Sequence, residues 1–450
     1  MKKVFEKVLE RITPTKKELN EEKQLVEEIR KKLKNINGTH SHLEWCGSSA
    51  RGTHLHGDRD LDLFLMFDKK LTEKQLEKEG LRIAKKIFKG HKWELAYSQH
   101  PYVRGVINSF DVEIVPSYIV KKGCEKKSAV DRTPFHNKYL LKRFNAKQKQ
   151  EVRLLKQFFK GIGAYGADLK NNSLPGYGIE LLVLKYGTFE KAIKGISKWK
   201  KGEIIEFGNI EKSVKKFEEP LVLIDPVDEN RNVASALNEE QFNRIIFASQ
   251  LFLKKPSEKF FFHEKKKIWE KERVKKMLSK KELLAIKGDF PQKVLSDLMW
   301  GQLKRFEKKI GTHLKENDFV VTRTKLWSNE KEVFFIIELE NIILQKSKKI
   351  IGPKTGDVEN VKRFLGKKRK ILSGPRVEKG RIVLEVERKQ TSAIKVLEEF
   401  LKENKKTEKD DLKLMLKKGK VLGEKELLEE HKGDFAEFFS LYLEGKEVFE

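Results

Sequence analysis

The spacing of apolar residues along the chain predicts alternating helices and strands. Near the N-terminus, apolar residues at helical spacing predict a helix over residues 14–35, with Thr13 as its N-cap. Residues 61–67 form an almost continuous apolar run, which is typical of a buried strand. We therefore expect a small mixed sheet with helices on one face. Its other elements are a helix capped by Thr72 and strands near residues 92–99, 102–107 and 110–115.

The remaining chain divides into a mainly helical middle region and a last region in which strands and helices alternate. In the middle region we expect a helix from residue 146 onwards, helices at 179–187, 189–200 and 239–254, and a strand at 221–224. In the last region we expect a strand at 283–287, helices at 294–310, 357–366, 391–404 and 424–443, hairpins at 318–340 and 370–388, and a basic loop at 346–354.

The charge balance indicates a polyanionic partner. The 97 lysine and arginine residues exceed the 68 aspartate and glutamate residues, which gives a formal net charge of +29. Growth at high temperature could also explain the charge density, but not its sign. No apolar run approaches the ~20 residues of a membrane-spanning helix, so nucleic acid is the favoured partner. Only two cysteines occur, Cys46 and Cys124, which is typical of a reducing compartment, and we expect a cytoplasmic protein.

Two aspartates stand at the start of the buried strand. Asp60 and Asp62 are two residues apart, so both carboxylates point the same way. Two acids on an apolar strand favour a cation between them, and Mg²⁺ is the natural candidate. The preceding turn contains Ser48 and Arg51, which with its backbone N–H groups could hold a triphosphate. The alternative is a solvated strand end in which Arg59 balances the charge.

A third acid is expected from the hairpin that turns at Asn108-Ser109. Asp111 and Glu113 share a face of its second strand, and either could complete a two-metal site. The alternative is an exposed acidic face on an edge strand.

A glycine-dense stretch at residues 161–166 follows the helix that begins at residue 146. Glycine lets a backbone approach a ligand closely. Lys156 and Tyr165, on either side of this helix end, could reach one phosphate group. Alternatively, Tyr165 is a core residue beside an ordinary helix C-cap.

Four histidines form two H-x-H pairs, His40 with His42 and His54 with His56. A zinc site is conceivable, but no further cysteine or histidine cluster completes it. Exposed loop histidines are the favoured interpretation.

The glycine-serine turn, the D-x-D pair and a third acid on a later strand together resemble the signature of the DNA-polymerase-β-like nucleotidyltransferase superfamily. Four further stretches narrow this resemblance: R-T-P-F-H at 132–136, R-L-L-K-Q-F at 153–158, G-I-G-A-Y-G at 161–166 and D-P-V-D-E-N-R-N-V-A at 225–234. In this order and spacing, the motifs resemble those of the archaeal-type CCA-adding enzymes, the CCA tRNA nucleotidyltransferases. The likeness extends through the first 255 residues and, in element order, beyond them.

The resemblance implies an α+β fold: a polymerase-β-like nucleotidyltransferase head (a mixed sheet with helices), a helical neck, and an α/β body and tail. We expect the catalytic head at residues 1–142, the base-recognising neck at 143–256, and the tRNA-binding body and tail at 257–450.

The resemblance also assigns residues. Asp60, Asp62 and Glu113 match the catalytic carboxylates that bind two Mg²⁺ ions. The family usually has Asp where this chain has Glu113, so a share of that role for Asp111 stays open. The nucleotide-binding residues implied are Ser48, Arg51, His136, Lys156, Tyr165 and Arg231, the last of which reads the incoming base.

The implied activity is addition and repair of the 3′-terminal CCA of tRNA. CMP, CMP and AMP pass from CTP and ATP to the tRNA 3′-hydroxyl without a nucleic-acid template, and pyrophosphate leaves. The acceptor stem and T-arm are expected to lie along all four parts of the enzyme, and a homodimer is compatible with the resemblance. Basic runs at 346–354 and 367–370, which flank one predicted helix, favour contacts to the RNA backbone.

Two other functions remain open. A poly(A) polymerase or another RNA-tailing nucleotidyltransferase would share the acid site, but it gives no reason for Arg231 and the 225–234 stretch. A non-catalytic RNA-binding protein would explain the charge, but not three acids directed into one cleft.

Overall fold

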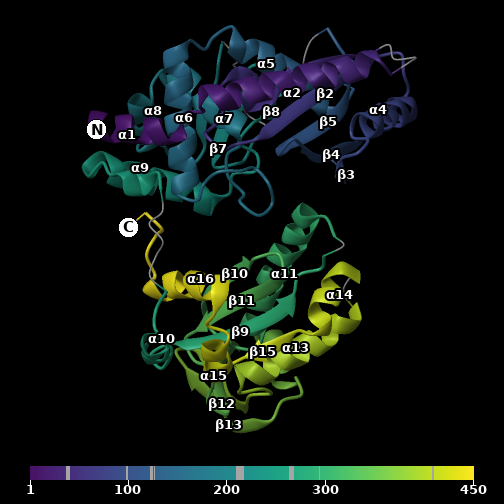
Figure 1. Ribbon diagram of the computed structural model, residues 1–450. Helices are drawn as coiled ribbons and strands as arrows, with labels where there is room; N and C mark the ends of the chain where they lie inside the picture. Colours follow the sequence, from purple (N-terminus) through teal and green to yellow (C-terminus); the bar gives the residue numbers. More distant parts are fainter. Residues whose placement is uncertain are drawn as a thin grey trace. The chain divides into compact units, whose positions relative to one another are not determined.

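The computed structural model describes residues 1–36, 41–97, 100–121, 125, 127–208, 217–262, 268–292, 294–407 and 410–449. The chain forms two compact units, residues 1–264 with 447–450 and residues 265–446 (Figure 1). His40 and Cys124 lie outside the described residues. No helix in the described part of the chain is long and apolar enough to cross a membrane.

A five-stranded sheet with strand order β1-β2-β5-β4-β3 forms the N-terminal part of the first unit. β2 and β5 run parallel, and the other neighbouring strands run antiparallel. This agrees with the mixed sheet expected from the sequence. The strands are β1 (His42–Cys46), β2 (Asp60–Asp68), β3 (Trp93–Tyr97), β4 (Pro101–Ile107) and β5 (Phe110–Ile119).

Two amphipathic helices cover one face of this sheet, as Figure 1 shows. Leu61, Leu63 and Leu65 of β2 pack with the apolar stripes of α2 (Lys16–Lys34) and α4 (Glu73–Ile87) in one buried cluster. Because strand side chains alternate, the residues between these leucines face the opposite side of the sheet. The packing of α2 and α4 therefore decides which face carries the acids.

The start of α2 differs from the prediction. Thr15, and not Thr13, is the N-cap: its hydroxyl accepts the Glu18 N–H at 3.2 Å, and the Glu18 carboxylate accepts the Thr15 N–H at 2.7 Å. This reciprocal capping box satisfies two backbone donors, which a cap at Thr13 could not do. Thr13 instead ends the preceding helix, α1 (Lys2–Ile12). The predicted cap of α4, Thr72, is confirmed.

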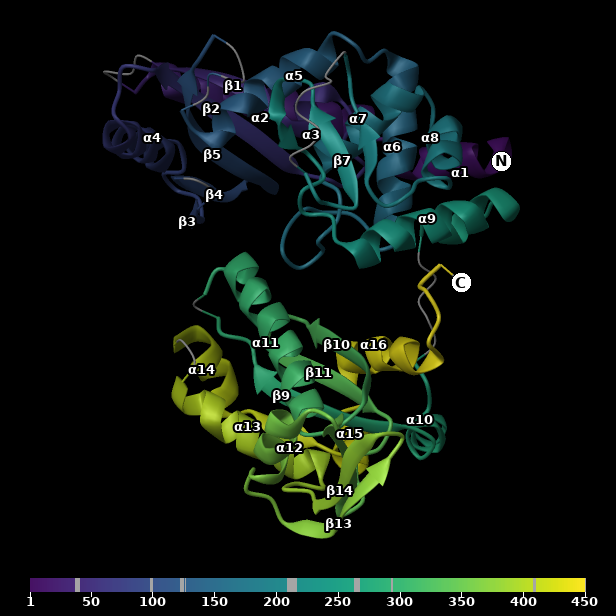
Figure 2. The same ribbon diagram turned by 180° about the vertical axis from the view of Figure 1, so that it is seen from behind.

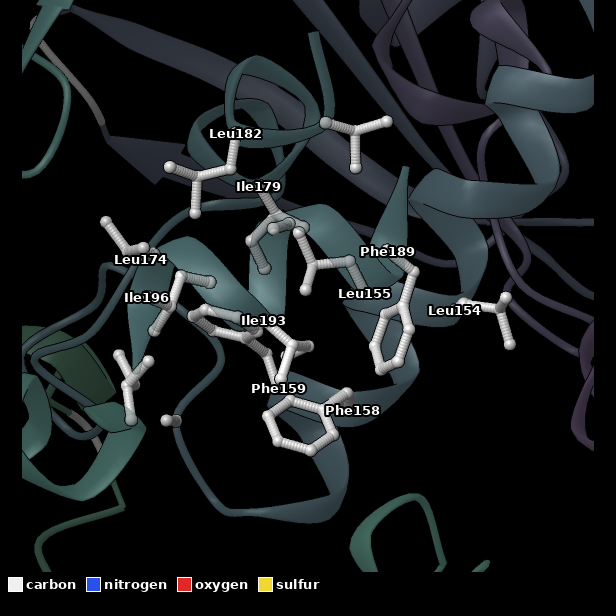
Figure 3. Packing of buried hydrophobic residues seen from close by; sticks show 14 of the residues in the cluster. Leu154, Leu155, Phe158, Phe159, Leu174, Ile179, Leu182, Phe189, Ile193 and Ile196 are labelled. Carbon is white, nitrogen blue, oxygen red and sulfur yellow. The ribbon is translucent and has the colours of Figure 1, made fainter. Parts of the chain in front are cut away.

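The rest of the first unit is mainly helical and packs around a cluster of phenylalanines (Figure 3). The Phe158 ring meets the Phe189 and Phe252 rings edge-on, at centroid distances of 5.7 and 5.5 Å. Such edge contacts add to the stabilisation from burial. The elements are α5 (Thr133–Leu141), α6 (Ala146–Gly161), α7 (Gly176–Tyr186), α8 (Phe189–Ile196), α9 (Glu239–Lys254), β6 (Glu203–Ile205), β7 (Leu221–Asp225) and β8 (Asp228–Asn232), with short 3₁₀ turns at Ala129–Arg132 and Glu258–Phe260.

The second unit contains two antiparallel sheets, with strand orders β10-β11-β9-β15 and β12-β14-β13. Its strands are β9 (Glu282–Asp289), β10 (Val321–Ser328), β11 (Glu332–Leu339), β12 (Ser347–Lys354), β13 (Ile371–Glu378), β14 (Arg381–Glu387) and β15 (Lys420–Leu422). Its helices are α10 (Lys271–Leu278), α11 (Ser296–Glu316), α12 (Val358–Leu365), α13 (Ala393–Thr407), α14 (Asp410–Lys417), α15 (Glu424–Glu429) and α16 (Gly433–Glu444).

Two predictions for this unit were wrong. The expected basic loop at 346–354 is strand β12, in which Lys349 pairs with Glu385 of β14. The lysines of this segment obscure the alternation of apolar and polar residues that would have predicted a strand. The helix expected at 424–443 is two helices, because Gly433 has a φ of +55°, which a continuous right-handed helix cannot contain.

Replacement of Gly80 tests the packing of α4 on the sheet. A Cβ at Gly80 would lie 2.2 Å from the Pro116 Cγ of β5. We expect Gly80→Ala to lower the free energy of unfolding by about 1–3 kcal/mol, although alanine favours helices by about 1 kcal/mol over glycine. Denaturant unfolding measures the change.

The control is Lys78→Ala, on the exposed side of the same helix. It should change stability by no more than about 0.5 kcal/mol. A Gly80→Ala protein as stable as the wild type would show that α4 does not pack as described.

Candidate active site

The predicted acids meet on adjacent strands. Asp60 and Asp62 lie at the start of β2, beside the parallel strand β5. In this register Asp60 is opposite Asp111, and Asp62 is opposite Glu113. All four carboxylates therefore belong to the face of the sheet opposite α2 and α4.

Gly47 lets the glycine-serine segment approach these acids. Residues 47–51, expected to be a turn, form the short helix α3 (Gly47–Arg51). A Cβ at Gly47 would lie 1.8 Å from the Asp62 Oδ2, and Gly47 has a φ of +75°. Only glycine meets both conditions. Ser48, the next residue, is half-buried in α3.

The carboxylates raise one another's pKa. Desolvation and the charge on Asp62 raise the pKa of Glu113 to about 7. Desolvation and the charge on Asp60 raise the pKa of Asp62, although Arg51 and Lys156 oppose this. Desolvation and two neighbouring carboxylates also raise the pKa of Asp60.

This donor set fits a divalent cation that arrives with a phosphate ligand. Across the described residues, no three His, Cys, Asp or Glu side chains converge closely enough to hold a metal alone, Asp60, Asp62 and Glu113 included. Mg²⁺ commonly binds one or two carboxylates and completes its shell with water and substrate phosphates. A cation here would also relieve the repulsion that raises these pKa values. A hollow of about 570 Å³ opens beside Asp60, Asp111 and Glu113.

The histidines of the H-x-H pairs serve other contacts, and the expectation of exposed loop residues was wrong for His54, which is 2% exposed. His54 Nε2 lies 3.0 Å from the buried Glu22 carboxylate, and His56 Nδ1 lies 2.9 Å from Glu18. His42 lies 3.5 Å from Glu44. Each described histidine thus faces a different glutamate, and these three do not share a metal site.

Two predicted phosphate ligands are gathered by a buried carboxylate on α7, Glu180. Arg51 Nη2 lies 2.8 Å from Glu180 Oε2, and Arg51 Nε donates to Oε1 at 3.2 Å. Lys156 Nζ lies 3.4 Å from the same Oε1 and 3.2 Å from the Thr53 carbonyl oxygen. The Thr53 hydroxyl also donates to Glu180. Arg51 and Lys156 are 6% and 2% exposed, so both are held inside the fold, where α3 meets α7 (Figure 2).

Tyr165 approaches the same place from the other side of α6. A Cβ at Gly176, the first residue of α7, would lie 2.9 Å from the Tyr165 hydroxyl and 3.6 Å from Lys156 Nζ. Glycine at this position therefore lets both groups reach the start of α7. The structure brings Lys156 and Tyr165 together, as the sequence suggested.

A second buried carboxylate, Asp225 at the end of β7, gathers two more predicted residues. It hydrogen-bonds to His136 Nε2 at 2.8 Å and accepts from Arg231 Nη1 at 2.9 Å and from the Tyr177 hydroxyl at 3.1 Å. Burial alone would raise the pKa of Asp225, but His136, the Val227 N–H and Arg231 lower it to about 2. The His136 ring stacks on Tyr177, with centroids 4.0 Å apart. The Arg231 side chain remains 31% exposed.

Sequence reasoning missed the roles of Glu180, Asp225 and Tyr177. Glu180 is a lone acid in the apolar run of α7, and a lone buried carboxylate requires a partner. Asp225 directly follows the fully buried strand β7. The sequence therefore indicated that Glu180 and Asp225 are buried, but it did not indicate which residues pair with them.

The second unit has a basic groove of about 690 Å³ between β12, β14 and the end of α12. Arg369 Nη1 and Arg388 Nε are buried there and have no hydrogen-bond partner among the described residues. The Arg369 guanidinium lies over the Phe364 ring, 4.5 Å from its centroid. The groove is lined by Lys348, Lys367, Lys368, Arg369, Lys370, Arg388 and Lys389, and by the acids Glu316, Asp318 and Glu387.

Three family models match successive parts of the chain. A nucleotidyltransferase domain matches residues 26–136, and the second domain of tRNA nucleotidyltransferase matches residues 150–262. The C-terminal domain of the CCA-adding enzyme matches residues 280–423.

Curated relatives span most of the chain. It is 38% identical to the CCA-adding enzyme of Methanosarcina mazei over 403 residues, which cover 88% of each chain. It is 36% identical to that of Methanocaldococcus jannaschii over 396 residues, covering 83% of this chain and 85% of the relative. It is also 36% identical to that of Saccharolobus shibatae over 390 residues, covering 87% and 90%. With this identity over most of its length, the chain belongs to the CCA-adding enzyme family.

Proposed function

We propose that this protein is a CCA tRNA nucleotidyltransferase. It transfers CMP, CMP and AMP from CTP and ATP to the 3′-hydroxyl of tRNA without a nucleic-acid template. In each step the 3′-oxygen forms a bond to the α-phosphorus, the bond between that phosphorus and the bridging oxygen to the β-phosphorus breaks, and pyrophosphate leaves. Family membership over most of the chain is the observation that carries this proposal.

The acids on β2 and β5 are proposed to hold two Mg²⁺ ions. Asp60 and Asp62 would bind both ions, and Glu113 would bind the one nearer the 3′-hydroxyl. When bound, such ions favour the deprotonated 3′-hydroxyl and neutralise the leaving pyrophosphate. The parallel register, which sets Asp62 opposite Glu113, supports this assignment.

Ser48, Arg51, Lys156 and Tyr165 are proposed to orient the triphosphate. The close approach of α3, which carries Ser48 and Arg51, to Asp62 at Gly47 supports this. Positioning of the reacting groups in line accounts for most of the catalysis in phosphoryl transfer.

His136 and Arg231 are proposed to contact the base of the incoming nucleotide. Asp225 fixes one end of the Arg231 guanidinium, while the rest of the side chain is exposed. A guanidinium held in this way can donate to acceptors on cytosine or on adenine as the shape of the pocket changes.

The second unit is proposed to contact the tRNA backbone through its basic groove. The lysine and arginine side chains that line this groove suit phosphate oxygens. We propose residues 1–142, 143–256 and 257–450 as head, neck, and body with tail. Contact with the acceptor stem and T-arm, a cytoplasmic location and a homodimer remain predictions.

The first prediction concerns the reaction itself. The purified protein, incubated with Mg²⁺, CTP, ATP and a tRNA that lacks its last three nucleotides, should add three residues and stop. Gel analysis of 3′-end products measures the length, and nearest-neighbour analysis measures the order. Longer tails would identify an RNA-tailing enzyme, and no product would leave an RNA-binding protein as the better interpretation.

The second prediction concerns the metal ligands. Asp62→Asn should reduce addition by about 10³-fold or more, because a metal ligand is lost at constant volume. Glu113→Gln should act alike, whereas Glu113→Asp should retain activity. Single-turnover addition measures each rate, and tRNA binding should persist in all three variants.

Asp111→Asn is the matched control on the same strand face. Activity near the wild-type level assigns the third ligand to Glu113. If Asp111→Asn is inactive and Glu113→Gln is active, the assignment passes to Asp111.

The third prediction concerns base selection. Arg231→Ala should reduce the discrimination between CTP and ATP by about tenfold, which is typical of losing one or two base contacts. The ratio of kcat/KM values for the two nucleotides on each tRNA end measures it. Arg244→Ala, which removes an arginine paired with Glu447, is the control. Unchanged selectivity in Arg231→Ala would exclude the proposed role.

A further inference from the structure

Glu180 is a fully buried carboxylate at a place where no charge is expected. It lies on α7, directly between the buried residues Ile179 and Leu181, and none of its surface is exposed. An isolated charge in such surroundings is costly, so its partners must compensate for the lost solvation.

Its partners come from two other elements of the first unit. Both carboxylate oxygens accept from Arg51 of α3, and one of them also lies near Lys156 Nζ of α6. The Thr53 hydroxyl donates to Glu180 Oε1, which is the oxygen that also lies near Lys156 Nζ. Two basic side chains thus share one carboxylate in a buried pocket.

Arg51 and Lys156 both act on Asp62, an acid of the sheet, where they oppose the rise of its pKa. The charge of Asp58 also acts on Lys156. Without Glu180, the two cations would repel each other, and the carboxylate that hydrogen-bonds to both of them would be lost.

We propose that Glu180 is a positioning residue for nucleotide binding, which holds Arg51 and Lys156 side by side and directed at the β- and γ-phosphates. The inference rests on the proposed function, because it assumes a nucleoside triphosphate in this pocket. Glu180 does not touch the nucleotide itself; it acts through the two cations.

The same carboxylate favours the charged form of the lysine. Burial and the neighbouring Arg51 lower the pKa of Lys156, and Glu180 raises it again. Removal of the Glu180 carboxylate would lower the pKa of Lys156 further and so favour its neutral amine. The pocket would therefore not gain positive charge for binding phosphate. Both the geometry and the charge of the phosphate site depend on Glu180.

Equilibrium binding of CTP and CMP to the full-length protein with Mg²⁺ tests the proposal. CMP lacks the β- and γ-phosphates but keeps the base, the sugar and the α-phosphate. Glu180→Gln, which keeps the volume and removes the charge, should weaken CTP binding by about tenfold. CMP binding should change by less than about twofold, since no contact to the base or α-phosphate is altered.

The matched control is Glu151→Gln, on the adjacent helix α6. The Glu151 carboxylate accepts the Phe189 N–H at 2.8 Å and, among the described residues, forms no ion pair with Arg51 or Lys156. This variant should bind CTP and CMP like the wild type. Equal weakening of CTP and CMP in Glu180→Gln would show a merely structural role and overturn the proposal, as would unchanged or tighter CTP binding.

A second variant guards against loss of folding. Thr53→Val removes the hydroxyl that donates to Glu180 but leaves every charge in place. It should weaken CTP binding by about threefold, again with little effect on CMP. If Glu180→Gln does not fold and Thr53→Val binds CTP normally, the proposal fails.

Addition of CMP to tRNA by the wild type, measured in parallel, distinguishes a failure of the role proposed for Glu180 from a failure of the proposed function. A wild type that extends tRNA while Glu180→Gln binds CTP normally contradicts only the role of Glu180. A wild type that extends no tRNA contradicts the proposed function.

Discussion

Repulsion between acids on neighbouring strands is the constraint on which the site depends. β2 and β5 run parallel in a register that sets Asp62 opposite Glu113, and α2 and α4 occupy the other face of the sheet. The carboxylates therefore cannot turn into the core, and burial together with the charges of neighbouring carboxylates raises their pKa values. A cation is the direct way to stabilise such a pair in its charged form. The proposed metal site thus rests on strand pairing and on the packing behind the sheet.

The helix α7 connects this acid site to the rest of the pocket. One turn of α7 separates Tyr177, which contacts Asp225, from Glu180, which contacts Arg51 and Lys156. Two buried carboxylates thus organise two sets of polar groups, one proposed to contact the base and the other the triphosphate. Because Tyr177 and Glu180 are on the same short helix, the spacing between the two sets is fixed by helix geometry. A rigid element of this kind suits an enzyme that must hold a nucleotide in line with an attacking hydroxyl.

Much of the first unit could be predicted from local patterns. The D-x-D spacing placed two acids on one strand face, and Asn108-Ser109 was correctly expected as a turn, since both residues have positive φ. The cap at Thr13 was wrong because the reciprocal Thr15–Glu18 pair competes successfully for the helix start. Glu180 could not be assigned, because its partner Arg51 lies 129 residues away and no local period records such a contact. Strand β12 was not predicted, because lysines occupy both faces of the strand and the sequence shows no alternation of apolar and polar residues there.

The most direct test of the account is to locate the metal. Anomalous diffraction from crystals of this protein with Mn²⁺ and CTP would show where the ion binds and which side chains hold it. The account predicts manganese at about 2.2 Å from carboxylate oxygens of Asp60 and Asp62, with Glu113 on one of the ions. Manganese bound only to the triphosphate, or to residues away from β2 and β5, would contradict it.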